Sequence, residues 1–166
     1  MVVLGIDPGL SVTGFGVLKK EGRSAQLLDY GALKLPATRS LPERVALFYD
    51  FFHAKIEQWQ VTDIALETPF LGKNAQNFLK LGYLRGVLYV LGTKQGVVFH
   101  EFSPREVKAA VTGFGGAEKE QVCRVILRLF PGLVALEKLD VSDALAVTLC
   151  GLWKAKQPYM LAADSK

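Results

Sequence analysis

The feature that most constrains the fold is a pair of short apolar runs, each of which ends in a carboxylate. The first run spans Val2–Asp7 (VVLGID) and the second spans Ile64–Glu67 (IALE). A nearly continuous apolar run of this length is typical of a strand that is buried on both faces of a sheet. If the two strands are parallel neighbours, Asp7 and Glu67 lie together at the carboxyl end of the sheet, where ligands of such sheets bind.

The remaining pattern predicts further strands and helices in a definite order. Strands over 13–20 and 26–35 follow the first with short connections, which indicates an antiparallel meander. Ser40 with Glu43, and Ser103 with Glu106, have the spacing of helix capping boxes. The other predicted elements are a helix from 41 to about 59, a strand over 63–68, a helix over 73–94, a strand over 97–102, and helices over 104–113, 117–130 and 140–155.

This order predicts an α/β fold with a mixed five-stranded sheet. Three early antiparallel strands are followed by parallel strands, and helices flank the sheet. With 166 residues the chain is expected to form one domain over 1–156, followed by a loose tail over 157–166. It has no run of eighteen apolar residues, so no membrane-spanning helix is expected. Two cysteines without metal-ligand spacing favour buried thiols in a reducing cytosol.

A second pair of carboxylates lies at the start of the last predicted helix. Asp140 and Asp143 are three residues apart, so they share a face of that helix. Carboxylates that converge from strand ends and a helix suit a hard cation such as Mg²⁺ or Mn²⁺ better than zinc. The net charge of +4 is compatible with a nucleic-acid partner but is common among soluble proteins. The combination favours metal-assisted chemistry on a polyanion, of which nucleic acid is the obvious example.

Two glycines interrupt the long helix predicted over 73–94. Gly82 and Gly86 lie four residues apart on one face, and each costs the helix about 1 kcal/mol relative to alanine. We expect the compensation to be a close approach of this helix, either to the sheet or to a second subunit.

The segment before this helix combines an aromatic residue, glycine and a cation. Phe70, Lys73 and Asn74 belong to it. Such a loop can stack on an unpaired base and hold a phosphate.

Several short motifs now identify a family resemblance. In chain order they are 5–9 (GIDPG), 65–67 (ALE), 73–75 (KNA), 79–82 (LKLG), 85–86 (RG), 107–108 (VK), 117–119 (AEK) and 140–146 (DVSDALA). Together, over about residues 2–153, they closely resemble the RuvC family of Holliday-junction resolvases, within the ribonuclease H-like superfamily. The resemblance implies a homodimeric crossover junction endodeoxyribonuclease of the bacterial cytoplasm. It also implies work with the RuvA and RuvB branch-migration proteins.

The same resemblance assigns roles to individual residues. The catalytic, metal-binding tetrad is expected to be Asp7, Glu67, Asp140 and Asp143. Phe70 matches an aromatic residue that stacks on bases near the crossover, and Lys108 and Lys119 match basic residues that face the DNA. The full set of expected DNA contacts is Phe70, Lys73, Asn74, Lys80, Arg85, Lys108 and Lys119. The expected dimer contacts are Gly82 and Gly86, which follow from the two glycines on one face of the long helix and not from the resemblance.

The expected chemistry is two-metal phosphodiester hydrolysis. Two Mg²⁺ ions, which Mn²⁺ can replace, would activate a water and stabilise the leaving oxygen. Asp7 is expected to bridge them, and Lys119 to act as a point charge on phosphate. The products would be nicks with 5′-phosphate ends. A twofold dimer would place two such sites on a symmetric junction.

Three other functions remain open from the sequence. Asp7-Pro8-Gly9 followed by Gly14 and Gly16 loosely resembles the phosphate-binding hairpin of an actin-like or sugar-kinase ATPase half-domain. A non-catalytic junction-binding module would share the basic residues. A related nuclease acting on ribosomal RNA precursors would share the fold.

Overall fold

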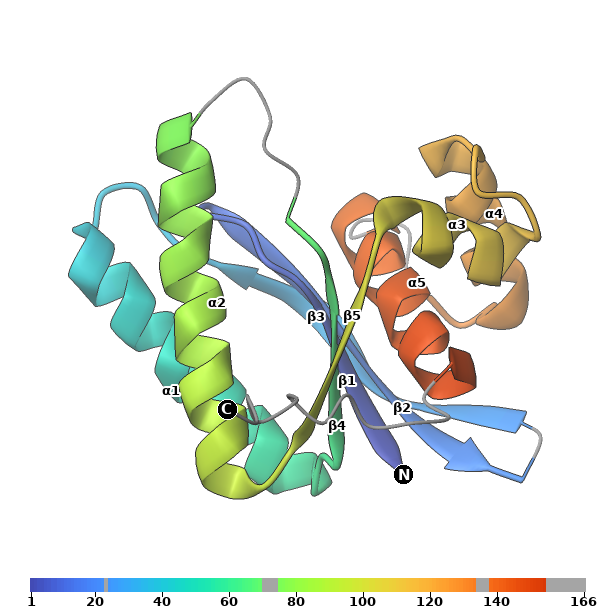
Figure 1. Cartoon of the computed structure of the whole chain (residues 1–166), viewed down its shortest axis with the longest axis horizontal. Helices are drawn as coiled ribbons and strands as arrows, with labels where there is room; N and C mark the ends of the chain where they lie inside the picture. The colour runs from blue at the N-terminus through green and yellow to red at the C-terminus, as the bar shows by residue number, and fades with distance from the viewer. Residues whose placement is uncertain (23, 70–74, 134–137, 155–166) are drawn as a thin grey trace, which may run out of the picture.

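The protein is a three-layer structure in which helices cover both faces of one sheet (Figure 1). The computed structural model describes residues 1–22, 24–69, 75–133 and 138–154, with only the backbone for 138–140 and 154. The strands are β1 (Val2–Asp7), β2 (Val12–Glu21), β3 (Ser24–Lys34), β4 (Asp63–Glu67) and β5 (Val98–Phe102). The helices are α1 (Leu41–Trp59), α2 (Ala75–Gln95), α3 (Pro104–Thr112), α4 (Lys119–Leu129) and α5 (Lys138–Lys154).

The sheet has the strand order β3-β2-β1-β4-β5. β2 pairs antiparallel with β1 and β3, whereas β4 pairs parallel with β1 and β5. This arrangement confirms the predicted mixed sheet, with an early meander followed by parallel strands. The element boundaries differ from the predicted ones by two residues or fewer at most ends, where local pattern is least decisive. The predicted tail over 157–166 lies outside the described residues.

Both predicted capping boxes are present. The backbone N–H of Ser40 donates to Glu43 Oε2 at 2.7 Å, and that of Ser103 donates to Glu106 Oε2 at 2.8 Å. Each serine hydroxyl in turn accepts from the backbone N–H of its glutamate. These reciprocal bonds fix where α1 and α3 begin.

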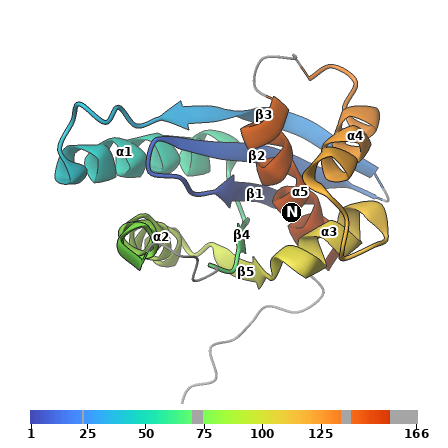
Figure 2. The same cartoon turned by 90° about the horizontal axis from the view of Figure 1, so that it is seen from above.

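The two faces of the sheet carry separate cores. α1 and α2 cover one face, and α5 with α3 and α4 covers the other (Figure 2). Along β1, Val3 packs toward the α5 face, while Leu4 and Ile6 pack toward α1 and α2. This alternation follows from the two-residue period of a strand. It explains why a strand buried on both faces reads as an unbroken apolar run.

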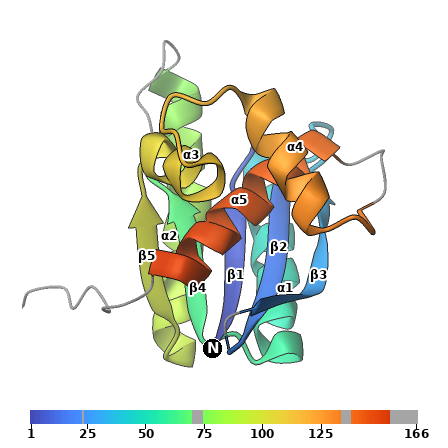
Figure 3. The ribbon, with the colours of Figure 1, turned by 90° about the vertical axis from the view of Figure 1, so that its right-hand side faces the viewer.

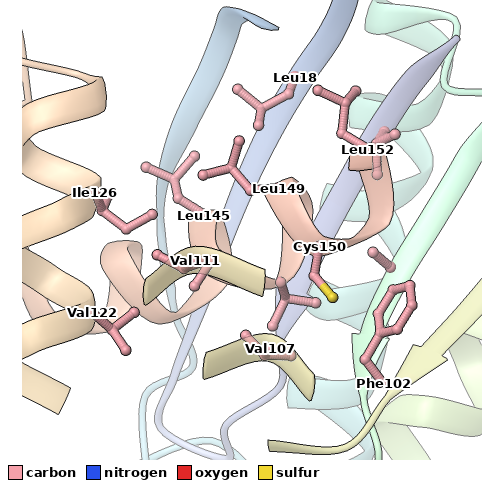
Figure 4. Close-up of a cluster of buried hydrophobic side chains, with 14 of the residues drawn as sticks. Leu18, Phe102, Val107, Val111, Val122, Ile126, Leu145, Leu149, Cys150 and Leu152 are labelled. Carbon is pink, nitrogen blue, oxygen red and sulfur yellow. The ribbon is translucent and has the colours of Figure 1, made fainter. Parts of the chain in front are cut away.

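α5 runs diagonally across β1 and β2 (Figure 3) and approaches them closely. A Cβ added to Gly5 of β1 would lie 2.6 Å from the backbone nitrogen of Thr148, and one added to Gly16 would lie 2.5 Å from Leu145 Cδ2. Glycine at these two strand positions therefore sets the distance between α5 and the sheet. Leu145, Leu149 and Cys150 of α5 then join the buried cluster drawn in Figure 4.

The surroundings of Gly82 and Gly86 on the long helix α2 differ from those that the sequence predicted. A Cβ added to either glycine meets no atom of the described residues within 4 Å, so the alternative of a close approach to the sheet is wrong. Both glycines instead line an open groove of about 640 Å³ between α1 and α2. Its lining is mostly apolar and includes Leu41, Pro42, Val45, Tyr49, Tyr83, Val87 and Val90.

None of the helices in the described parts of the chain, 1–22, 24–69, 75–133 and 138–154, is long and apolar enough to cross a membrane.

Candidate active site

Two predicted carboxylates lie side by side at one end of the sheet. Asp7 is the last residue of β1 and Glu67 is the last residue of β4. The two strands are parallel, and Ile6 is paired with Leu66. The next residue of each strand is therefore a carboxylate at the same level of the sheet, as the two apolar runs predicted.

The last helix adds a third carboxylate to this end of the sheet. Asp143 lies near the start of α5, and its side chain lines the same pocket as Asp7 and Glu67. Asp140 lies in the first turn of α5, one turn before Asp143, but its side chain is outside the described part of the chain. Its place in the site therefore stays a prediction from the helix spacing.

The pocket is small, with a volume of about 250 Å³. α3 contributes Lys108 and α4 begins with Lys119, so two lysines face three carboxyl groups. Lys119 Nζ lies 2.8 Å from Asp143 Oδ2, and its side chain is 69% exposed. Apolar side chains close the walls, namely Pro104, Val107, Val122, Ala146 and Val147.

The pKa of Glu67 reflects its burial and the carboxylates around it. Its burial, and then the nearby charges of Asp7 and Asp143, raise the pKa of Glu67 from 4.5 to about 7. Lys119 and Lys108 act in the opposite direction. The hydrogen bond and charge of Asp143, with smaller contributions from Asp7 and Glu67, raise the pKa of Lys119. Burial and the neighbouring carboxylates thus outweigh the two lysines at Glu67.

These residues fit a bound hard cation. The donors are all carboxylate oxygens, which Mg²⁺ and Mn²⁺ prefer. A cation between them would relieve the repulsion that raises the pKa of Glu67. Within the described residues, no three acidic, histidine or cysteine side chains are already in a metal-ligating arrangement.

Six of the seven predicted DNA contacts divide into three groups. Lys108 and Lys119 line the pocket, as described above. Lys80 lies half-buried on α2 and does not line it. Phe70, Lys73 and Asn74 lie outside the described residues.

Arg85, the remaining predicted DNA contact, is held by other residues of the protein. Its side chain is only 8% exposed, and its guanidinium donates to the backbone oxygen of Glu67 at 2.7 Å and to Glu101 Oε1 at 2.5 Å. In this structure the guanidinium is therefore occupied by protein partners, and its contact with DNA stays a prediction. The sequence contains a weak signal of the arrangement, because Arg85 and Tyr89 have the i, i+4 spacing of neighbours on a helix.

Sequence comparison places the chain among known proteins. The family model described as "Crossover junction endodeoxyribonuclease RuvC" matches residues 3–151. A protein of that name from Pelodictyon phaeoclathratiforme is 40% identical over 168 residues, covering 100% of this chain and 88% of the relative. One from Chloroherpeton thalassium is 41% identical over 166 residues, covering 100% of this chain and 88% of the relative.

Structural comparison gives the same result. The structure of Thermus thermophilus RuvC superposes with a TM-score of 0.83 at 29% identity, covering 92% of this chain and 94% of that one. The same protein in complex with a Holliday junction substrate gives a TM-score of 0.84, covering 92% and 93%. A carboxylate pocket at the shared sheet end, a match over nearly the whole chain and this superposition agree, and the chain belongs to the RuvC family.

Proposed function

We propose that this chain is a structure-selective endonuclease that resolves four-way DNA junctions by paired symmetric nicks, in recombination and repair. The observation that carries the proposal is the pocket in which Asp7, Glu67 and Asp143 meet Lys108 and Lys119. It occurs in a chain that matches crossover junction endodeoxyribonucleases over its full length. The resemblance in fold extends to a relative that was solved with a Holliday junction.

The family consists of metal-dependent nucleases. For this chain we propose two Mg²⁺ ions per subunit, replaceable by Mn²⁺, held by Asp7, Glu67 and Asp143 together with Asp140. Bound there, the metal would lower the pKa of a water and neutralise charge on the phosphate. The carboxylates carry the repulsion that such binding relieves, and this is the observation that supports the assignment.

The two lysines supply positive charge where a phosphate would enter. Lys119 is paired with Asp143 yet largely exposed, so its ammonium can reach a phosphate that enters beside Asp143. Lys108 borders the same pocket from α3. Both act as mobile point charges on the phosphodiester. Cleavage then leaves a 5′-phosphate and a 3′-hydroxyl.

Recognition of the crossover is assigned to the residues that follow Glu67. Phe70 is proposed to stack on a splayed base, and Lys73, Asn74 and Lys80 to contact the DNA backbone. Stacking by an aromatic contributes about 1–3 kcal/mol per base. Phe70→Ala should slow junction cleavage without lowering the melting temperature. A large drop in melting temperature would assign Phe70 to the core.

The open groove between α1 and α2 is proposed as the contact with a second subunit. Gly82 and Gly86 lie in its lining, next to the exposed apolar side chains of Tyr83 and Val90. An apolar surface that no residue of the described chain covers suits a second copy, and a twofold dimer matches the two nicks that resolution requires. RuvA and RuvB remain proposed partners by family membership, in a bacterial cytoplasm.

The deciding experiment compares cleavage of a labelled synthetic four-way junction with that of duplex, fork and single strand, each with Mg²⁺ and with chelator. The proposal predicts paired nicks in the junction only, and only with metal. Equal cleavage of duplex would contradict structure selectivity, and an intact junction would contradict nuclease activity. ATP hydrolysis without DNA cleavage would instead favour the ATPase half-domain.

A further inference from the structure

The backbone of Glu67 is held at the point where its strand ends. Glu67 is paired with Phe102 as the last step of the β4–β5 ladder. The N–H of the next residue, Thr68, donates to the Phe102 oxygen at 2.7 Å. The carbonyl oxygen of Glu67 accepts from Arg85 Nη1 at 2.7 Å. The peptide group that follows Glu67 is therefore fixed at both of its polar atoms.

Arg85 is itself fixed by two further side chains. Its Nη2 donates to Glu101 Oε1 at 2.5 Å and lies 3.2 Å from the Tyr89 hydroxyl. The Tyr89 hydroxyl also donates to Glu101 Oε1. The ring of Tyr89 packs edge-on against Phe99 of β5, with 5.2 Å between ring centroids. We call Arg85, Tyr89 and Glu101 the β5-edge clamp.

We infer that Arg85 is a positioning residue for the carboxylate of Glu67, and that Tyr89 and Glu101 hold Arg85 in the required orientation. The inference rests on the proposed function, since it concerns how that site is built, and it adds a role that the carboxylates themselves do not supply. Arg85 does not touch the reacting atoms. It acts through the Glu67 backbone.

The chemistry of arginine explains why this residue suits the position. Its planar fork presents parallel N–H donors, so one guanidinium serves the Glu67 carbonyl and the Glu101 carboxylate together. A lysine ammonium has no such fork. Glu101 also supplies the negative charge that a largely buried guanidinium requires. Without Arg85, the carbonyl at the end of β4 would lose its hydrogen-bond donor.

The position of Arg85 in the fold gives the clamp a second consequence. The same helix, α2, presents Arg85 toward the strand ends and Gly82, Tyr83 and Gly86 toward the open groove. A displacement of α2 at the groove would move the donor of the Glu67 carbonyl. A metal site needs its ligands held to within about 0.5 Å, so the clamp makes the position of α2 part of the catalytic geometry.

The test uses the full-length protein with Arg85→Lys, Tyr89→Phe and Glu101→Gln. Three quantities are measured: the single-turnover cleavage rate of a bound junction, the junction Kd, and the Mg²⁺ concentration that gives half of the maximal rise in melting temperature. For Arg85→Lys we expect cleavage slower by about 10- to 100-fold, a several-fold higher Mg²⁺ midpoint and an unchanged Kd. Tyr89→Phe and Glu101→Gln should change the first two quantities in the same direction by less.

Lys55→Gln is the matched control. Lys55 forms a comparably placed ion pair with Asp29, 2.6 Å long, between α1 and the opposite edge strand β3. Its loss should lower the melting temperature while leaving the cleavage rate and the Mg²⁺ midpoint unchanged. This control separates a general loss of stability from a loss of positioning.

Several outcomes would overturn the inference. A folded Arg85→Lys protein with the wild-type cleavage rate and Mg²⁺ midpoint would show that Arg85 is only a structural residue. A much weaker binding of the junction with an unchanged Mg²⁺ midpoint would show that Arg85 is a DNA contact. If Arg85→Lys does not fold, wild-type behaviour of both Tyr89→Phe and Glu101→Gln would refute the clamp. Failure of the wild-type protein to cleave would refute the proposed function instead, while the Mg²⁺ midpoint would still test the clamp.

Discussion

α5 lies directly against the sheet, whereas α1 stands off from it on a layer of aromatic side chains. Beneath α5, glycine is required because a Cβ at Gly5 would lie 2.6 Å from the backbone nitrogen of Thr148. Beneath α1, Phe15 packs edge-on against Phe51 and Phe52, with ring centroids 5.2 and 6.3 Å away. Backbone contact leaves little freedom to adjust, while an aromatic layer can repack.

The difference between the layers corresponds to a difference in chemistry. α5 places Asp143 in the carboxylate pocket, and the neighbouring helices α3 and α4 place Lys108 and Lys119 there. The layer of α1 and α2 instead contains the open apolar groove. The face of the sheet that α5 covers closely carries the carboxylate pocket, and the face that α1 and α2 cover carries the exposed apolar groove. Arg85 of α2 connects the two, because it bonds to the Glu67 backbone.

The largest expected change in stability tests the close packing of α5 on the sheet. Gly5→Ala should destabilise the protein by about 3 kcal/mol or more, because the new Cβ meets backbone atoms that cannot rotate away. Gly82→Ala is the control on the other layer. Its new Cβ meets no atom within 4 Å among the residues that the structure describes, so the substitution should be neutral or stabilise the protein by up to about 1 kcal/mol. Urea denaturation of both variants provides the measurement, and equal destabilisation would refute the contrast between the layers.

The next effect tests the groove. Gly86→Leu adds a bulky side chain to the groove lining, at a position where the Cβ itself meets no described atom within 4 Å. It should weaken self-association by about 1–3 kcal/mol while leaving the far-UV circular dichroism unchanged. Analytical ultracentrifugation over a concentration series measures the dimer Kd. A wild-type protein that sediments as a monomer at micromolar concentration, or an intact Gly86→Leu dimer, would show that the groove is not the subunit contact.

A smaller effect tests the charge in the pocket. Because the folded-state pKa of Glu67 is raised from 4.5 to about 7, the folded protein binds a proton there more tightly than the unfolded chain. This contribution to stability is complete below about pH 4.5 and is lost as the pH rises through about 7. In chelator, Glu67→Gln should therefore be more stable than wild type by about 1–2 kcal/mol at pH 8, after allowance for solvent screening.

The same comparison at pH 4.5 is the control for this prediction. At this pH the side chain at position 67 is neutral in both folded proteins, so the difference in their free energies of unfolding should nearly vanish. Equal differences at the two pH values would mean that the substitution acts through packing and not through charge.

The smallest effect on stability is expected at Lys119. Its ion pair with Asp143 has one largely exposed partner, so Lys119→Met should change the free energy of unfolding by about 0.5 kcal/mol or less. Cleavage should nevertheless fall by about 100-fold if the ammonium stabilises charge on the phosphate. A variant that cleaves at the wild-type rate would remove Lys119 from the chemistry.

Local and periodic features were predictable from the sequence. The apolar runs that end at Asp7 and Glu67 identified two buried strands and placed both carboxylates at one sheet end. The capping boxes at Ser40 and Ser103 located two helix starts, because the signal lies within four residues. In these cases the residues that make the structure are neighbours in the chain.

Features that depend on tertiary packing were not predictable. Arg85 resembles any helix cation until Glu101 of β5 and the end of β4 are brought to it, 16 and 18 residues away. Gly82 and Gly86 reduce helix propensity wherever they lie, so their pattern could not distinguish a close contact from an open groove. The requirement for glycine at position 5 likewise appears only when α5, more than a hundred residues later, packs on β1.

The central claim is that the carboxylates at the ends of β1, β4 and α5 form a metal-dependent nuclease site. The most direct test measures junction cleavage by Asp7→Asn in saturating Mg²⁺, together with its junction Kd. Removal of this charge should reduce cleavage by about 1,000-fold or more. Junction binding should remain intact or become tighter, because repulsion against phosphate is relieved. Near-normal cleavage by Asp7→Asn would contradict the claim.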